Sequence, residues 1–323
     1  QQSEGEPNLE PLATQDVRSD ALSATVYRPA TYLEVDWQAT RQWLWVFGTR
    51  LDYFSEINSW GIDPRVTSIY SLSEQTRLKA GVGSFTQAPE FQESADDSVG
   101  NPALEPLRAL HTGLGIEHDL KAHITLGAEG FYKHIFNRVV RNVDGAEPNF
   151  INDGLGRIYG LELSGRVQPK GRFFGFLSYT LSRSERNDRD EGWRLFDFDQ
   201  THIFTASGTY RLGRGWELGS TVRLVSGNPD TPVVGSVYDG NADLFIPING
   251  PINSTRNPLF HRLDVRIEKL WRFQTWKLAL YLDVQNAYNA QNREGVSYSF
   301  DYRESSDVTG LPIIPSLGIR GEL

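Results

Sequence analysis

Charged and apolar side chains alternate along many segments of this sequence, and the charged ones are the first residues that could do chemistry. The pattern is regular around Arg262, Asp264, Arg266 and Glu268, where every second side chain is ionic. Because successive side chains of a β-strand point to opposite faces, this alternation collects charges of both signs on one face. Such a surface could contact a polar solute or a polar protein segment. The alternative is that its opposite charges pair with one another in a wet lumen.

Ten residues are candidates for contact with a ligand or with a protein segment inside the fold. Six are charged and lie on the polar faces of expected strands, and four are aromatic and lie in long polar loops. Exposed aromatic rings among polar residues suit ligand contact, but they could equally pack one loop against another, and no ligand identity follows. The candidates are Arg50, Arg77, Glu129, Arg223, Arg262, Arg266, Trp193, Phe196, Tyr238 and Phe245.

The residue types that can bind metal ions are present, but their spacing does not match known metal sites. Glu90, Glu93, Asp96 and Asp97 bring four carboxylates into one loop, and such oxygens could bind Ca²⁺. Their spacing matches no EF-hand loop, so an ordinary solvated loop is favoured. The six histidines are scattered, and neither a His-x-x-x-His pair nor a cysteine completes a zinc site. The sequence therefore predicts no metal site and no cofactor.

Glycine patterns and nucleophile motifs give no support for an enzyme. Gly81-x-Gly83 and Gly113-x-Gly115 lack the third glycine and the following helix of a nucleotide-binding fingerprint. In strands, glycine more simply marks bends or close packing. The sequence has no Gly-x-Ser-x-Gly elbow, so a hydrolase of that type has no support. The chain is predicted to be a non-enzyme.

The bulk composition excludes several classes of protein. The chain has 323 residues, a mean hydropathy of −0.43, and no uncharged run near the ~20 residues that a membrane helix requires. A formal net charge of −9 and a pI of about 5.3 argue against a nucleic-acid partner. Aromatic residues reach 12%, which suits aromatic girdles at two membrane interfaces, although a large soluble β core also favours them.

The sequence has no cysteine and no methionine, and it begins with Gln1 and Gln2. A disulfide is therefore excluded. The missing initiator methionine predicts a processed or trimmed product that no longer has a signal peptide. Residues 1–22 are polar, contain two prolines and show no sustained period, so they are predicted to be a surface loop segment. Residues 23–323 are predicted to form one barrel domain.

Residues 260–289 show the unit that recurs along the chain, which is two alternating strands joined by a short turn. Connections between the expected strands alternate between short (about 2–5 residues) and long (roughly 9–32 residues), as in outer-membrane barrels. A sandwich or propeller has no reason to place every long loop at one end. The predicted fold is all-β: a transmembrane antiparallel β-barrel with about 13–14 strands of a larger barrel. The long loops are expected at 55–63, 88–103, 137–153, 183–196 and 226–257.

The expected strand count is odd. We interpret residues 290–303 as a continuation of the twelfth strand past a bulge near Asn292, which gives thirteen strands. Single-chain bacterial barrels have even numbers, and two unpaired edges are costly in lipid. Either the count is wrong by one, or part of the barrel lies outside this chain. Treating residues 290–303 as a separate strand gives fourteen strands. The last strand would then run in the direction opposite to the one that the alternation of short and long loops requires.

Five strings, in order, resemble those of TonB-dependent outer-membrane receptors. In that family a strand ends in an aromatic–Pro stretch, and an Asn-Pro-x-Leu-x-Pro segment begins the next. The resemblance covers roughly residues 25–323, although Leu323 departs from the aromatic residue that usually ends the barrel. The strings are SFTQAPEFQE (84–93) with NPALEPLRALHTGLGIEHDL (101–120), RIYGLELSGRV (157–167), FDFDQTHIF (196–204), LDVQNAYN (282–289) and GIRGEL (318–323).

The resemblance implies a 22-stranded barrel of the Gram-negative outer membrane, plugged by an N-terminal domain, that imports scarce ligands. This sequence shows no plug, no energy-coupling box and about nine strands too few, so it resembles the C-terminal portion of such a receptor. The implied partners are outer-membrane lipid, a plug domain with the missing strands, from the rest of the chain or a partner chain, and a TonB-type energy-coupling protein that acts through the plug. Because a large barrel is otherwise an open hole, contact with a plug is favoured for the lumen-facing charges.

Three function hypotheses follow. The first is an outer-membrane receptor and transporter barrel for a siderophore, vitamin, glycan or peptide. The second is a self-contained passive pore or structural surface barrel, which would conduct ions alone. The third is a soluble β-rich binding protein or enzyme, which would dissolve without detergent. We favour the first, on the loop alternation and the five strings.

Overall fold

The computed structural model describes residues 25–95, 100–143, 146–189 and 191–323. The surface loop segment predicted at residues 1–22 lies outside these ranges, and so do Asp96 and Asp97 of the acidic loop. Within the described ranges the protein is built almost entirely of antiparallel strands, with one short helix, α1 (Phe91–Ser94). No helix there is long and apolar enough to cross a membrane.

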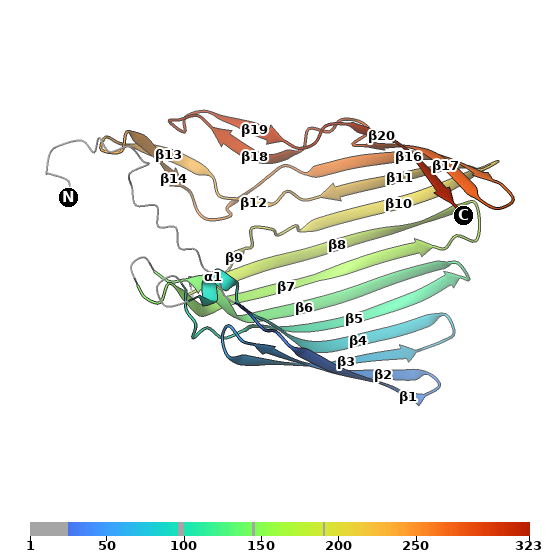
Figure 1. Ribbon diagram of the computed structural model, residues 1–323, viewed down its shortest axis with the longest axis horizontal. Helices are drawn as coiled ribbons and strands as arrows, with labels where there is room; N and C mark the ends of the chain where they lie inside the picture. Colours follow the sequence, from blue (N-terminus) through green and yellow to red (C-terminus); the bar gives the residue numbers. More distant parts are fainter. Residues whose placement is uncertain (1–24, 96–99, 144–145, 190) are drawn as a thin grey trace.

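Thirteen strands follow one another in a single curved antiparallel sheet, and each pairs with its neighbour in sequence order (Figure 1). The predicted count of thirteen is therefore confirmed. A fourteenth segment, β9 (Arg194–Leu195), pairs only with β8. The thirteen strands are β1 (Ala30–Thr40), β2 (Trp43–Phe54), β3 (Ser59–Ser71), β4 (Thr76–Gln87), β5 (Leu107–Lys121), β6 (Ile124–Arg141), β7 (Phe150–Val167), β8 (Phe173–Asp188), β10 (His202–Gly213), β11 (Trp216–Val225), β16 (Phe260–Arg272), β17 (Lys277–Gln285) and β20 (Ile314–Glu322).

The strand register places apolar side chains on one face of the sheet and polar ones on the other. One row across β5 to β8 pairs Leu114, Gly130, Leu161 and Leu181, and the adjacent row on the opposite face includes Glu129. The apolar face is exposed: Leu114 is 68% accessible. The sheet therefore has no dry interior between two layers, which excludes the soluble sandwich.

The two ends of the sheet differ, as the loop lengths predict. At one end, here called the turn end, the connections are tight; at the other, the loop end, long excursions carry α1 and small hairpins (Figure 1). The only described apolar core is a small cluster of Phe54, Ile57, Ala88 and Leu104. The small loop strands are β12 (Pro229–Asp230), β13 (Val233–Asp239), β14 (Leu244–Asn249), β15 (Thr255–Arg256), β18 (Arg293–Tyr298) and β19 (Ser305–Thr309).

The loop predicted at residues 55–63 is wrong in length, because β3 already begins at Ser59. Gly61 and Pro64, residue types that usually favour turns, lie within β3 instead. Pro64 is tolerated because β3 pairs with β2 alone up to this point and with both neighbours only from Arg65 onward. Asp63 closes the gap to β4, since its carboxylate accepts the Thr86 backbone N–H at 3.0 Å and hydroxyl at 2.7 Å.

The predicted continuation of the twelfth strand through residues 290–303 is also wrong. Strand β17 ends at Gln285, and β18 and β19 form a separate hairpin that does not join the large sheet. Asn286 ends the strand because its backbone enters the left-handed region (φ 51°). Its side-chain amide then bonds Ala290 and Leu311 and fixes the departure of the chain.

The two edges of the sheet run in the same direction. Strand β1 enters the turn to β2 at the turn end, and β20 finishes at that same end, because an odd number of antiparallel strands separates them (Figure 1). Among the described residues, β1 pairs only with β2 and β20 only with β17. Pairing these two edges directly would be parallel, unlike every other pair in the sheet.

We predict that Asn286→Ala destabilises the sheet by about 2–4 kcal/mol, because it removes several buried hydrogen bonds and leaves an alanine in the left-handed region. Asn286 is 2% exposed. The midpoint of denaturant unfolding measures the change. Asn241→Ala is the control: Asn241 is exposed in the turn between β13 and β14, and its loss should matter by less than about 0.5 kcal/mol. Equal effects of the two substitutions would contradict this role of Asn286.

Candidate functional site

The six charged candidates all lie on the polar face, but they are spread over five strands and form no single pocket. Most are held by carboxylates of the same wall. The Arg50 Nε lies 2.8 Å from an Asp52 carboxylate oxygen. Arg77 lies 3.0 Å from Asp119 and 3.5 Å from Glu117. These contacts fit the alternative considered from the sequence, in which opposite charges pair along a wet wall.

The other two arginines of this group, on β16, also pair within the wall. Arg262 contacts Asp264 at 3.0 Å. Arg266 contacts Glu268 at 2.7 Å, and its guanidinium lies 3.8 Å from the centre of the Tyr281 ring. Salt bridges between partly exposed groups contribute little stability each. Their effect here is to hold long side chains against the wall and keep the polar surface ordered.

Glu129 and Arg223 lack such a partner among the described ion pairs. Glu129 lies directly across from Glu162 of β7, so two carboxylates face each other on neighbouring strands. Like charges in this arrangement repel. Arg223 lies across from Arg262, and its guanidinium is 5.9 Å from the Phe260 ring. These positions therefore retain charge that the wall does not neutralise.

A hollow on the polar face adjoins Glu129. Its volume is about 390 Å³, and its floor is made of glycines on β4 and β5. Gly113 shows why the floor of this hollow is made of glycine, because a Cβ at this position would lie 3.1 Å from a Glu129 carboxylate oxygen. The rim carries Arg65, Lys79, His111 and Lys133. This arrangement can receive a polar side chain or loop from within the lumen.

The aromatic candidates of the loop end fall into two separate groups. Trp193 stacks on Arg157, with the guanidinium 4.1 Å from the ring centre, and Phe196 stacks on Arg186 at 4.0 Å. Arg186 is 7% exposed. Its burial lowers the pKa of its guanidinium to about 10, and nearby Arg138 acts in the same direction. These two arginines are not among the candidates predicted from the sequence, since nothing in their spacing shows that a loop folds over them.

The second aromatic group joins two loop hairpins. The ring of Phe245 lies 5.1 Å from that of Tyr238 within the β13–β14 hairpin, and 5.5 Å from the edge-on ring of Phe300. The Tyr238 hydroxyl donates to Asp243 at 2.7 Å, which raises the pKa of that phenol. Phe300 belongs to the turn of β18–β19, so the cluster packs loop against loop.

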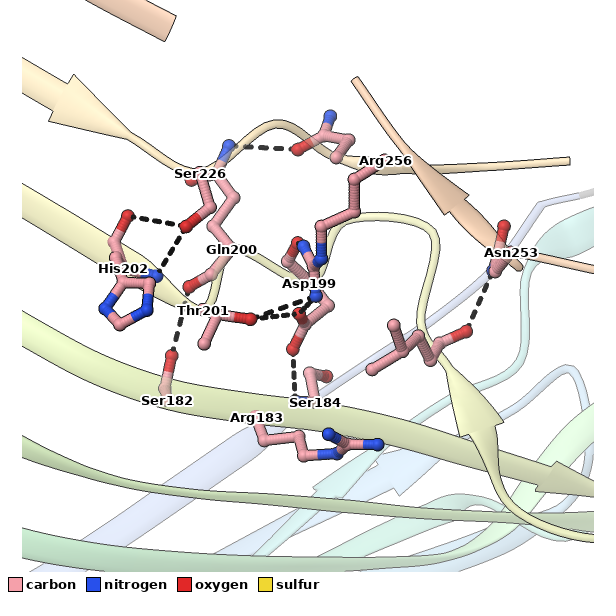
Figure 2. A network of polar contacts seen from close by, with 12 residues as sticks. Ser182, Arg183, Ser184, Asp199, Gln200, Thr201, His202, Ser226, Asn253 and Arg256 are labelled. Carbon is pink, nitrogen blue, oxygen red and sulfur yellow. Dashed lines mark hydrogen bonds and ion pairs between the residues drawn. The ribbon is translucent and has the colours of Figure 1, made fainter. Parts of the chain in front are cut away.

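Asp199 is the centre of a buried polar network at the loop end (Figure 2). It is 1% exposed. Its carboxylate accepts the Ser184 backbone N–H at 2.6 Å and the Thr201 hydroxyl at 3.1 Å, and it pairs with the Arg256 guanidinium. Arg256 also donates to the Gly227 carbonyl oxygen at 3.0 Å. The network thus joins β8, the start of β10 and the loop after β11.

Asparagine side chains complete other ends of the sheet in the same way. Asn292 accepts the His261 backbone N–H and donates to the His261 carbonyl oxygen, each at 2.9 Å, as a neighbouring strand would. Asn152 makes the matching pair of bonds with Glu105, and Asn101 donates to the Phe150 carbonyl oxygen at 2.8 Å. Asn101 lies in one of the recognised strings, as Asp199 and Asn286 do, so these strings contain residues that fix the loop ends.

The acidic loop is used for local structure in its described part. The Glu93 carboxylate accepts the Glu90 backbone N–H at 2.8 Å and so caps α1. Across the ranges that the structure describes, no three His, Cys, Asp or Glu side chains are grouped to hold a metal ion.

A one-layer antiparallel sheet with an exposed apolar face, a charged opposite face and long loops at one end defines the wall of a β-barrel of the outer-membrane type. The sequence matches the family described as TonB dependent receptor-like, beta-barrel over residues 2–287. The chain belongs to this family, as the resemblance in its motifs predicts.

Solved structures show the same fold. The ferric-catecholate import receptor Fiu from E. coli K12 aligns with a TM-score of 0.64 at 16% identity, over 92% of this chain and 44% of that one. The transporter YddB from Escherichia coli gives 0.66 at 11% identity, over 92% and 45%. The ferripyoverdine receptor of Pseudomonas aeruginosa gives 0.64 at 15%, over 92% and 38%.

This chain thus spans less than half the length of those proteins. A comparison with curated proteins gave no match.

We predict that Asp199→Ala destabilises the loop end by about 3–5 kcal/mol, because it leaves the Arg256 guanidinium and the Ser184 N–H without their buried partner. Limited proteolysis of residues 191–200 and the unfolding midpoint measure the effect. Asp197→Ala is the matched control, since the Asp197 side chain is 62% exposed and its loss should matter by at most about 1 kcal/mol. If both variants resist protease like the parent, Asp199 does not hold this loop.

Proposed function

We propose that this chain is the C-terminal part of the barrel wall of an outer-membrane receptor that takes up a scarce ligand in a Gram-negative bacterium. The observation that carries the proposal is the two-faced sheet, apolar outside and charged inside. A siderophore or another iron chelate is favoured among the ligand classes, because several similar structures are of iron transporters and siderophore receptors. A vitamin, a glycan or a peptide is the alternative ligand class.

Two aromatic belts on the apolar face support a position in a membrane. The turn-end belt includes Trp43 and Trp271, and the loop-end belt includes Tyr53 and His261, whose ring stacks on Tyr288. On β2 and on β16 the two belt residues are ten positions apart, from 43 to 53 and from 261 to 271. At about 3.3 Å per residue and a tilt of about 40°, this is roughly 25 Å, the height of the apolar band of such barrels.

Strand direction specifies what completes the barrel. Because β1 and β20 run the same way, antiparallel closure requires an odd number of further strands between them. A second copy of this sheet would supply thirteen strands, which is an odd number. Its edge strands would, however, be antiparallel to β1 and β20 only if that copy crossed the membrane in the opposite orientation. We therefore infer that a different segment supplies the missing strands, in the rest of the chain or in a partner chain.

The polar face suits a plug. The hollow next to Glu129 and the unneutralised charges of Glu129, Glu162 and Arg223 need a partner within the lumen, and a plug domain would provide one. Energy would then reach the ligand site through the plug from a TonB-type protein. A self-contained passive pore is the second candidate function; the open edges of the described sheet disfavour it, because unpaired backbone groups in lipid cost several kcal/mol each.

Two neighbouring substitutions on β7 test the membrane position. Leu163→Arg puts a charge on the apolar face and should destabilise the protein by about 2–4 kcal/mol, whereas Glu162→Arg changes the lumen face and should matter by less than about 1 kcal/mol. Urea unfolding of the protein in lipid vesicles measures both values. Equal destabilisation by the two arginines would mean that the apolar face does not meet lipid.

A double neutralisation tests the plug. Glu129→Gln with Glu162→Gln removes a repulsion within the wall, so the wall itself should be no less stable. If a cationic plug residue lies against this pair, the same change should loosen the plug and speed its cleavage by protease several-fold. Arg50→Gln, at a position already paired with Asp52, is the control. Unchanged cleavage in the double variant would contradict plug contact at this site.

A further inference from the structure

The apolar face carries an open groove that the import proposal does not use. Its volume is about 720 Å³, and it lies across β5 to β8. Leucine side chains of β5, β7 and β8 and two tyrosines line it, and Gly130 forms its floor. The register shows that Leu114 and Leu161 flank Gly130 on the same face. An apolar groove on the face that meets the membrane suits a lipid acyl chain.

One end of the groove is ionic. Arg183 lines it and lies directly across from Tyr159, which itself pairs across the strands with Tyr132. This row of two tyrosines and an arginine is on the loop-end side of the groove. Polar-tipped aromatic rings mark the level of lipid head groups. The groove therefore runs from head-group level into the acyl-chain region.

The arginines at this end carry more charge than their partner neutralises. Glu185, with a side chain only 6% exposed, accepts the Arg183 Nε–H at 2.7 Å and the Arg157 Nε–H at 2.6 Å. Two guanidinium groups thus share one carboxylate, which leaves one net positive charge. Arg183 remains 54% exposed at its side chain, and the planar, multi-donor guanidinium is well suited to bind phosphate.

We propose that this groove binds an acyl lipid with a phosphate-bearing head group, in the membrane leaflet on the loop-end side. One acyl chain lies over Gly130, between the leucines, and the phosphate meets Arg183. Charge complementarity selects the head group, and the groove selects the chain. The proposal rests on the membrane position proposed above, but it is independent of which ligand is imported.

Two substitutions separate the two halves of the site. Arg183→Gln removes the phosphate contact and leaves Glu185 paired with Arg157, so the wall keeps its buried ion pair. Gly130→Leu fills the groove, and it should fold because a Cβ there meets nothing nearer than 4.0 Å, the Gly160 carbonyl oxygen. Arg320→Gln is the matched control, since it removes the same charge from the lumen face at a side chain that is 53% exposed.

The experiment is native mass spectrometry of the protein in its native form, released from phosphatidylcholine nanodiscs that contain bis-phosphorylated lipid A as the probe. The parent and Arg320→Gln should each retain one probe molecule. Retention should fall roughly tenfold in Arg183→Gln and in Gly130→Leu, as expected for loss of a charge-assisted contact or of the chain site. The parent protein should retain dephosphorylated lipid A as weakly as the Arg183→Gln variant retains the phosphorylated probe.

Three outcomes would overturn the proposal: equal retention by all variants, an equal loss in the Arg320→Gln control, or displacement of the probe by inorganic phosphate alone. Failure of the protein to enter nanodiscs at all would overturn the membrane position first, and the lipid site with it. A protein that inserts, yet retains no probe, would reject the lipid site and leave the import proposal standing.

Discussion

Every backbone amide and carbonyl of this sheet needs a partner, and that need shapes the molecule. A single layer of strands has no second layer to cover it, so a face exposed to lipid offers no water to satisfy an unpaired group. The thirteen strands meet the requirement by pairing in sequence order. Where the sheet ends in loops, asparagine amides take the place of a missing strand, as Asn292 does for His261. The same need is the reason why we propose that further strands pair with the open edges of β1 and β20.

The division of labour between the two faces follows from this pairing. Alternation along each strand gives one face to lipid and the other to the lumen. Whether a residue stands at an odd or an even position in its strand therefore determines which of the two environments its side chain meets. On the lumen face, charges mostly pair within the wall, as Arg266 does with Glu268. Glu129 and Arg223 are exceptions among the described residues, since neither has a described ion-pair partner in the wall. On the lipid face, Gly130 opens a groove beside an arginine, a feature that an import function does not need.

The sequence predicted the sheet well because period 2 is a property of neighbouring residues. Strand number, face assignment and the position of most long loops could be derived from it. It failed at Pro64 and at Asn286, where the outcome depends on which strand lies alongside and on a left-handed backbone. The candidate site could be predicted less well from the sequence for the same reason. Nothing in the local pattern shows that Phe196 covers Arg186 or that Arg183 and Arg157 share Glu185, since these contacts join separate strands and a loop.

The central claim is that the sheet separates lipid from a wet lumen. The sequence has no cysteine, so single cysteines along residues 203–210 of β10 can each carry a nitroxide spin label without interference. Paramagnetic resonance then measures collisions with oxygen, which concentrates in lipid, and with a water-soluble nickel chelate. We expect oxygen exposure at Phe204, Ala206, Gly208 and Tyr210, and nickel exposure at residues 203, 205, 207 and 209. Equal exposure to the nickel chelate at all eight positions would contradict the central claim.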